Sequence, residues 1–223
     1  MSDRVIYENT NINRISYLFM KNQQTDSDFW MQWVLANATS FCVGLLYFPF
    51  IFPFNFFTSL VPGLAQWLIL RKQISGLSRW WISTNILGII IYGFMGGKLA
   101  FSSSSFSNFC YYYTHISNIC AVLAYSISGF FGGFITGVQQ WFFLKRYVSL
   151  SRLQTSCILA NTLGWTLGGF IGSITLLKTI FTVYFFIGLL AYGLLFGMLN
   201  GAITGVFLIK IIKHNNRLIT LAK

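Results

Sequence analysis

The sequence predicts an all-α membrane protein, a polytopic bundle of about six transmembrane helices arranged as three repeated helical hairpins with both termini in the cytoplasm. Three observations predict this fold class. The chain is 55% hydrophobic and 9% charged, with a mean hydropathy of +0.65, whereas soluble domains carry roughly 25% charged residues. About six stretches are long enough to span a bilayer, which takes about 20 apolar residues. Similar residue patterns also recur in alternate stretches.

The spans are expected near residues 30–52, 54–71, 81–100, 117–145, 154–177 and 182–210. Taken in pairs, they form hairpins at about 30–72, 81–146 and 154–210, within a transmembrane region of residues 29–213. Residues 1–28 are predicted as a cytoplasmic N-terminal segment and residues 214–223 as a cytoplasmic tail. The fourth and sixth spans are long enough to tilt or to extend beyond the hydrocarbon.

The first span of each pair carries an early asparagine, in WVLAN (33–37), WISTN (81–85) and CILAN (157–161). The second span ends in a Gln-Trp pattern, GLAQWLILRK (63–72) and GVQQWFFLKR (137–146), whose third copy, NGAITGVFLIK (200–210), has lost the Gln-Trp pair. At about 1.5 Å per residue these positions lie about 10 Å deep. They predict one polar layer in the cytoplasmic leaflet, made of Asn37, Asn85, Asn161, Gln66, Gln140 and Thr204.

This polar layer has two interpretations. Carboxamides donate and accept hydrogen bonds, so the layer could fasten neighbouring helices together at about 0.6 kcal/mol per contact. Alternatively, some of the amides could face a cavity and bind a ligand. Trp67 and Trp141, with the nearby Arg71 and Lys145, are expected to anchor the helices at the membrane interface, and the alternative for the tryptophans is a stacking surface for a ring-bearing ligand.

Small residues recur every fourth position along both kinds of span. Such rows let helix backbones approach closely where lipid supplies no hydrophobic drive for association. They predict packing positions at Gly63, Gly88, Gly133, Gly137, Gly164, Gly168, Gly172, Gly197, Gly201 and Gly205.

Lysine and arginine set the expected orientation. They cluster after the second, fourth and sixth spans, whereas the opposite loops hold only Lys98 and Lys178. Both termini are therefore expected in the cytoplasm, where this basic surface would meet anionic lipid head groups. The net charge of +11 does not indicate nucleic-acid binding, because the cations sit in small clusters at the ends of apolar runs.

The cysteines show no metal-binding spacing and predict no disulfide framework. Cys110 and Cys120 could pair if their segment faces an oxidising compartment. Between the third and fourth spans, FSSSSFSNFCYYYT (101–114) is expected in the interfacial aromatic belt, with a ligand-binding loop as the alternative.

The repeated motif resembles a group of uncharacterised bacterial, cyanobacterial-type membrane proteins that repeat G-x-x-QW-x-x-L-R and W-x-x-x-N in helical hairpins. The resemblance covers about residues 33–210, and the third copy departs from it by losing Gln-Trp. It implies the hairpin architecture and a bacterial plasma membrane, or a thylakoid membrane, and it implies no activity.

Acidic residues constrain the chemistry. All four of them (Asp3, Glu8, Asp26, Asp28) precede Trp30, and only His115 and His214 supply imidazoles. General acid–base and metal chemistry rely on such groups held close together, so we expect no enzyme, no metal and no cofactor. The favoured function is a non-enzymatic scaffold, subunit or accessory factor of a membrane assembly, with residues 1–28 as a partner contact or amphipathic surface helix. The alternative is an uncoupled transporter or channel for a small neutral or anionic solute.

Overall fold

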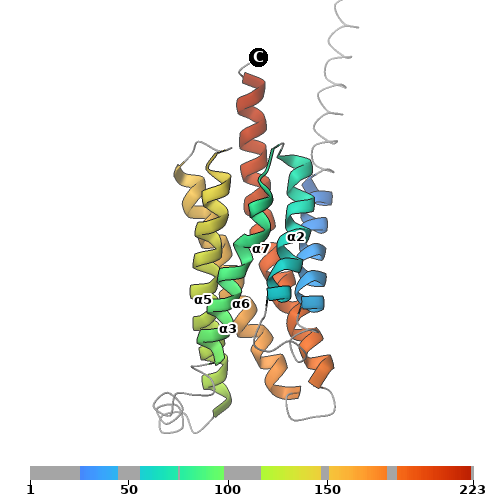
Figure 1. Ribbon diagram of the computed structural model, residues 1–223, viewed down its shortest axis with the longest axis vertical. Coiled ribbons are helices and arrows are strands. Elements are labelled where there is room, and N and C mark those ends of the chain that lie inside the picture. Colours follow the sequence, from blue (N-terminus) through green and yellow to red (C-terminus); the bar gives the residue numbers. More distant parts are fainter. Residues whose placement is uncertain are drawn as a thin grey trace, which may run out of the picture.

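The computed structural model describes residues 26–44, 56–74, 76–97, 117–146, 151–179 and 185–221. Within these ranges the regular secondary structure is helical, without a strand. The helices run side by side along one long axis (Figure 1). The all-α part of the prediction is therefore confirmed.

The helix bounds follow the predicted spans to within a few residues at most ends. The N-terminal helix is described over residues 26–44. It is followed by α2 (Phe56–Gln73), η1 (Arg79–Ser83), α3 (Thr84–Gly97), α5 (Ser117–Leu144), α6 (Ser151–Thr179) and α7 (Phe185–Leu221). Helix α7 continues well past the predicted end at residue 210 and protrudes from the bundle (Figure 1).

Three of the described helices are long and apolar enough to cross a membrane. The qualifying segments are Ile119–Leu144 in α5, Thr155–Thr175 in α6 and Phe186–Lys213 in α7. Large apolar side chains such as Phe130, Phe134 and Phe170 remain more than 40% exposed on these helices. An apolar outer surface of this extent suits contact with lipid, so the chain has the character of a membrane protein.

Local sequence signals explain how α2 gives way to η1. Arg71 and Lys72 occupy the last turn of α2, where cations interact favourably with the helix dipole. Gly76 then adopts φ 80°, a left-handed conformation that glycine reaches without a Cβ penalty. The Ser78 side chain accepts a hydrogen bond from the Trp80 backbone N–H. It thereby caps a 3₁₀ turn where the sequence predicted the start of a continuous α-helix at residue 81.

The helices pack in a definite order. Helix α5 lies between α3 and α6, α6 also packs against α7, and α2 packs against η1 and α3. The N-terminal helix lies beside α7, where the Trp30 indole donates to the Ala202 carbonyl over 3.1 Å. The first and last described helices are thus neighbours, although they lie far apart in the sequence.

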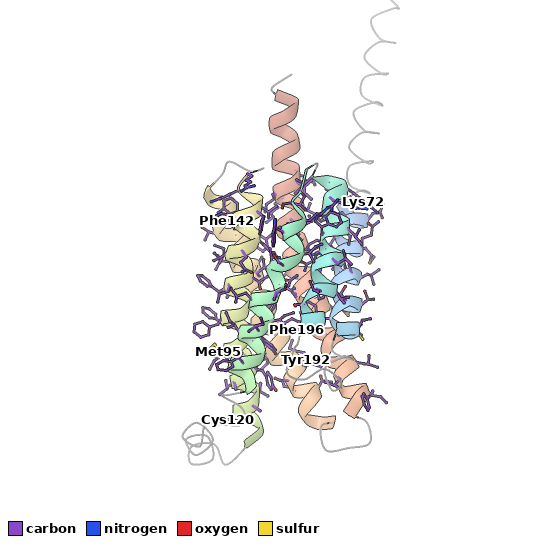
Figure 2. All side chains as sticks on the ribbon, in the orientation of Figure 1. Lys72, Met95, Cys120, Phe142, Tyr192 and Phe196 are labelled. Atoms are coloured by element: carbon purple, nitrogen blue, oxygen red, sulfur yellow. The ribbon has the colours of Figure 1, made fainter. Side chains whose placement is uncertain are left out.

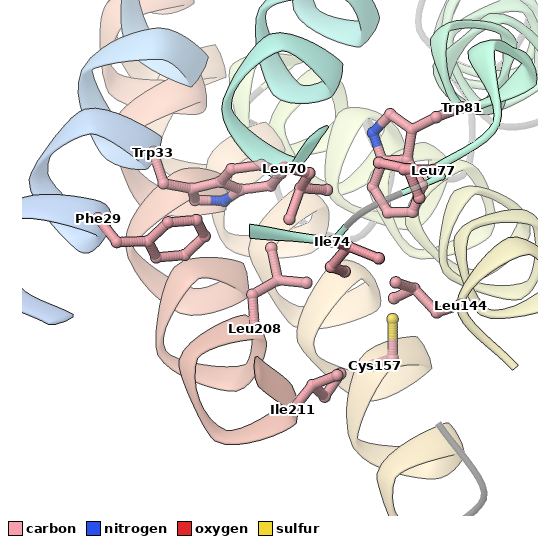
Figure 3. Packing of buried hydrophobic residues seen from close by; sticks show 10 residues of the cluster. All are labelled: Phe29, Trp33, Leu70, Ile74, Leu77, Trp81, Leu144, Cys157, Leu208 and Ile211. Atoms are coloured by element: carbon pink, nitrogen blue, oxygen red, sulfur yellow. The ribbon is translucent and has the colours of Figure 1, made fainter. Parts of the chain in front are cut away.

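Two apolar clusters form the interior. The apolar cap lies toward the end where Arg71 and Lys145 stand, and Figure 3 shows its ten buried residues: Phe29, Trp33, Leu70, Ile74, Leu77, Trp81, Leu144, Cys157, Leu208 and Ile211. The aromatic cluster lies further along the bundle, where Figure 2 marks Tyr192 and Phe196. Its members are Phe41, Ile89, Trp165, Tyr192 and Phe196, with the partly buried Tyr92 packed against them.

Candidate functional site

Between the two apolar clusters lies a network of buried carboxamides, which is the candidate site. Gln66 Nε2 donates to Asn37 Oδ1 over 2.7 Å, and Asn85 Nδ2 donates to Gln66 Oε1 over 3.1 Å. Gln140 Nε2 reaches the same Gln66 Oε1 over a longer 3.4 Å. Asn161 Nδ2 donates to Gln140 Oε1 over 3.0 Å. The network therefore joins the N-terminal helix, α2, α3, α5 and α6.

Two of the asparagines are also fastened to their own helices. Asn37 Nδ2 donates to the Trp33 carbonyl over 2.8 Å, and Asn161 Nδ2 donates to the Cys157 carbonyl over 3.1 Å. Both contacts span four residues, so the amide folds back over the preceding turn of its helix. The bond to its own helix therefore orients each amide toward its partner on another helix.

Thr204 takes a different role from the other five residues of the predicted layer. Its hydroxyl accepts from Trp33 Nε1 over 2.9 Å and donates to the Asn200 carbonyl over 2.7 Å. The neighbouring Asn200 reaches Asn37 instead, with a long Nδ2–Oδ1 contact of 3.5 Å. Asn200 was missed from the sequence, because in the repeat it occupies the position of Pro62 and Thr136 rather than that of a carboxamide.

The layer is sealed from solvent. None of Asn37, Asn85, Asn161, Asn200, Gln66, Gln140 and Thr204 is more than 4% exposed. Leu70, Leu144 and Leu208 of the apolar cap lie one helical turn from the layer, toward the basic end. Phe41 and Trp165 of the aromatic cluster lie one turn from the layer in the opposite direction. A low-dielectric setting strengthens satisfied hydrogen bonds and makes unpaired polar groups costly.

Some buried polar atoms near the layer do lack a hydrogen-bond partner within the described chain. They are Asn85 Oδ1, Asn200 Oδ1, Thr136 Oγ1 and the indole Nε1 atoms of Trp81 and Trp165. Buried polar groups nearly always have a hydrogen-bond partner, either in the protein or in ordered water, so these atoms are exceptions to the usual pattern.

All ten predicted packing glycines approach another helix closely. A Cβ at Gly137 would lie 2.8 Å from Ile158 Cα, and one at Gly201 would lie 2.9 Å from Val34 Cα. At Gly63 it would overlap the Ile82 carbonyl. The other contacts are Gly88 with Thr136, Gly133 with Asn161, Gly164 with Asn200, Gly168 with Phe196, Gly172 with Tyr192, Gly197 with Asn37, and Gly205 with Trp30 and Trp33. These approaches bring the amides on facing helices within hydrogen-bond reach.

The predicted anchors lie at the basic end, packed against the apolar cap. Trp67 and Trp141 are partly buried against the cap, and Trp67 Nε1 donates to the Leu77 carbonyl over 3.3 Å. The Arg71 guanidinium carbon lies 4.7 Å from the Trp67 ring centre, and Lys145 Nζ lies 3.9 Å from the Phe142 ring centre. Trp80 is 69% exposed, more than the partly buried Trp67 and Trp141. It was not predicted as an anchor from the sequence, because it lies outside the repeated Gln-Trp pattern.

The cysteines divide into two groups. Cys42 and Cys157 are free thiols. Cys120 is disulfide-bonded, which agrees with the possibility of a bridge that the sequence left open for this residue. Cys110 itself, Lys98, His115 and the segment 101–114 lie outside the described residues, as do the acids Asp3 and Glu8 and the rest of residues 1–25.

Among the described residues, no group of three or more His, Cys, Asp or Glu side chains is placed to hold a metal ion. The carboxamides of the layer are neutral hydrogen-bonding groups, so the arrangement suits fixing helices or holding an uncharged polar molecule. No protein-family model, curated protein or solved structure matches this chain.

Proposed function

We propose that this chain is a non-enzymatic integral membrane protein that serves as a scaffold, subunit or accessory factor in a membrane assembly. The observation that carries the proposal is the amide network, because Gln66 and its partners bond chiefly to one another. A site built for turnover would present such groups to a substrate. Carboxylates, on which acid–base chemistry depends, do not occur after Asp28.

The proposed architecture is six spans in three hairpin repeats, with each repeat packed on the next. Gly63 contacts Ile82, Gly137 contacts Ile158, and Gly201 contacts Val34. In each case, the glycine that precedes the Gln-Trp position meets the second residue of the next W-x-x-x-N or C-x-x-x-N motif. The third contact returns from the last helix to the first, which supports a closed ring of three repeats.

The N-terminal helix, α2, and η1 together with α3 are each long enough to serve as one of the three shorter proposed spans. The N-terminal helix and α2, with 19 and 18 described residues, are about 28 and 27 Å long at 1.5 Å per residue. The 14 residues of α3 supply about 21 Å, and the five residues of η1 add about 10 Å. Each approaches the hydrocarbon thickness of about 30 Å.

The proposed orientation puts the basic end, and both termini, in the cytoplasm. Arg71, Lys72, Lys145, Arg146 and Lys210 are exposed at that end, and each would contribute about 1 kcal/mol near an anionic lipid surface. Disulfides persist in oxidising compartments, so the disulfide at Cys120, at the opposite end in Figure 2, supports the same orientation. A bacterial plasma membrane, or a thylakoid membrane, is the proposed location because of the motif resemblance.

The experiment is purification from native membranes in mild detergent, with quantitative mass spectrometry of all bound proteins, lipids and pigments. A membrane protein recovered at a fixed ratio to this chain, and lost when residues 1–28 are deleted, supports the accessory function and the role of that segment. Recovery of the chain without any partner at fixed ratio would contradict it.

The alternative function, uncoupled passage of a small neutral or anionic solute, draws on one specific observation. Within the described residues, Asn85, Thr136 and Asn200 each keep a buried polar atom without a hydrogen-bond partner. A solute path would need such groups, but it would also need the apolar cap to open, because Leu70 and Leu144 are fully buried there. Reconstitution in liposomes separates the two functions.

A further inference from the structure

One amide of α5 does not belong to the buried network. Gln139 lies within the segment Ile119–Leu144, which is long and apolar enough to cross a membrane. Its side chain is only partly buried, and its covered Oε1 has no hydrogen-bond partner in the described chain. Its Nε2 is not one of the buried atoms that lack a partner, so the N–H groups border the surroundings of the helix. A polar group without a partner is costly in an apolar environment.

The repeat does not require an amide at this position. The residues that correspond to Gln139 are Ala65 in α2 and Ile203 in α7, and both are partly buried, as Gln139 is. The position therefore lies at the border of the interior in each repeat, and the other two repeats carry an apolar side chain there. Gln66 and Gln140, each one position later, supply the amides of the network. The network therefore makes no use of Gln139.

Gln139 interrupts an apolar stripe along α5, which we call the α5 stripe. Its members recur every three or four residues and so share one face of the helix; they are Phe131, Ile135, Gln139 and Phe142. Phe131 and Phe142 are 42% and 51% exposed, and Ile135 is partly buried. An exposed apolar face suits an apolar helix, and polar side chains inside a membrane form hydrogen bonds between helices.

Positive charge follows the α5 stripe at the basic end. Lys145 Nζ lies 3.9 Å from the centre of the Phe142 ring, and Arg146 is exposed next to it. The chain has no carboxylate side chain after Asp28. A second copy could therefore offer only the acids of its first 28 residues to Lys145, so this charge favours a partner of different sequence.

We propose that a transmembrane helix of a different protein packs along the α5 stripe, a contact that rests on the proposed function as a subunit or accessory factor. Gln139 Nε2 donates to a side-chain oxygen of that helix, from an asparagine, glutamine, serine or threonine. An acidic residue of the same helix lies about 9 Å nearer the basic end, which is the rise over six residues, and pairs with Lys145. Apolar side chains between these two polar contacts pack on Phe142.

A designed transmembrane peptide tests the α5 stripe without the native partner. The peptide is a helix of leucine and alanine with one asparagine and, six residues nearer one end, a glutamate. Resonance energy transfer in liposomes measures its association with the purified full chain, labelled at the C-terminus. We expect association to weaken about threefold when leucine replaces the asparagine, the effect of one hydrogen bond between helices in a membrane. The Gln139→Leu chain should bind both peptides equally, at the weaker level.

Thr39→Val is the matched control. Thr39 is also an exposed polar residue, but its hydroxyl already donates to the Leu35 carbonyl of its own helix over 2.7 Å, so this variant should bind the asparagine peptide as the native chain does. A Gln139→Leu chain that still prefers the asparagine peptide, or a native chain that binds both peptides equally, would overturn the proposal. Energy transfer between two labelled copies of the chain, lost in Gln139→Leu, would also overturn it by assigning the α5 stripe to a second copy.

Purification from native membranes separates this proposal from the proposed function. We expect the protein recovered at a fixed ratio with the native chain, and with Thr39→Val, to fall at least about threefold with Gln139→Leu. An unchanged ratio would overturn docking on the α5 stripe and leave the proposed function standing. Absence of any fixed-ratio partner from the native chain would contradict the proposed function and, with it, this docking.

Discussion

At the scale of single residues, Gln66 is the hub of the structure. Its amide contacts Asn37, Asn85 and Gln140, which come from three other helices, and the side chain is 1% exposed. The adjacent helix backbones come close because glycines precede the glutamines. One uncharged side chain therefore fixes the relative height of four helices.

Replacing this hub should cost stability. We expect Gln66→Leu to lower the free energy of unfolding by about 2 kcal/mol, because three contacts at about 0.6 kcal/mol each are lost and Asn37 and Asn85 keep unpaired groups. Thermal unfolding in detergent, followed by circular dichroism, measures the change.

The matched control is Gln139→Leu. Gln139 is the residue before Gln140, is only partly buried and has a buried Oε1 without a partner in the described chain, so its loss removes no hydrogen bond and should leave stability unchanged or raise it. Equal effects of the two substitutions would show that Gln66 matters only as a bulky side chain.

The residues of the amide layer could be predicted from the sequence only where the motif is repeated. Asn37, Asn85, Asn161, Gln66 and Gln140 could be brought into one layer because the same motif occurs more than once. Asn200 and Thr204 belong to the copy that has diverged, and their bonds to Asn37 and Trp33 became apparent only from three-dimensional contacts. The aromatic cluster was also missed, because 24 phenylalanines and 11 tyrosines leave no distinctive pattern of buried rings.

At the scale of helices, glycine spacing decides which faces meet. Gly133 and Gly137 of α5 lie against Asn161 and Ile158 of α6, and Gly164 and Gly168 of α6 lie against Asn200 and Phe196 of α7. Helix α6 therefore carries small residues on the face toward α7 and receives the small-residue face of α5. This alternation explains why α6 can be enclosed on two sides while Leu159, Leu163 and Leu167 stay exposed.

The loss of stability in a Gly→Ala variant should depend on which atom the new methyl group meets: a backbone atom should cost more than a side-chain ring. In Gly137→Ala, the new Cβ would lie 2.8 Å from the Ile158 Cα, a backbone atom that cannot move alone. We expect a loss of about 2 kcal/mol or more in the free energy of unfolding. In Gly205→Ala, the nearest atoms are the Trp30 and Trp33 rings at 3.0 Å, which can shift.

Thermal unfolding of the two alanine variants in the same detergent checks this grading. A Gly205→Ala variant that is less stable than Gly137→Ala would mean that the α5–α6 contact is looser than described. The comparison is fair because each change adds one methyl group within a helix.

Helix ends were less predictable than helix faces. The sequence placed a span start at residue 81, but Ser78 caps a 3₁₀ turn that begins at Arg79, a local hydrogen bond that hydropathy does not register. Helix α7 extends to Leu221 because the polar residues after Lys213 do not include proline or glycine. The apolar stretch is limited to the part of the helix that can contact lipid, whereas the helix itself continues until a residue breaks its backbone hydrogen bonds.

At the scale of the whole molecule, the first and last described helices meet. Trp30 bonds to Ala202, Trp33 bonds to Thr204, and Lys213 forms an ion pair with Asp26. In the proposed ring, three interfaces follow the same plan at their glycines. At this one, the Trp33–Thr204 hydrogen bond stands where the other two have an Asn–Gln pair. The proposed closed ring of repeats depends on it.

The proposed orientation is directly testable by reporter fusions. Green fluorescent protein fused after Lys223 should fluoresce, because that end is expected in the cytoplasm, and alkaline phosphatase inserted between α6 and α7 should be active. The reciprocal pair of fusions is the control. Active phosphatase at the C-terminus would reverse the orientation, and activity at both positions would contradict the six-span proposal.

If the buried amides hold the bundle together and do not form a solute path, the purified chain should carry no solute across a bilayer. Stopped-flow light scattering of liposomes that contain the purified chain, challenged with water, urea, glycerol and small anions, measures this. The rates should equal those of protein-free liposomes. Faster flux of any solute with the native chain, abolished in a folded Asn85→Leu/Gln140→Leu variant, would contradict it and assign the amide layer to transport.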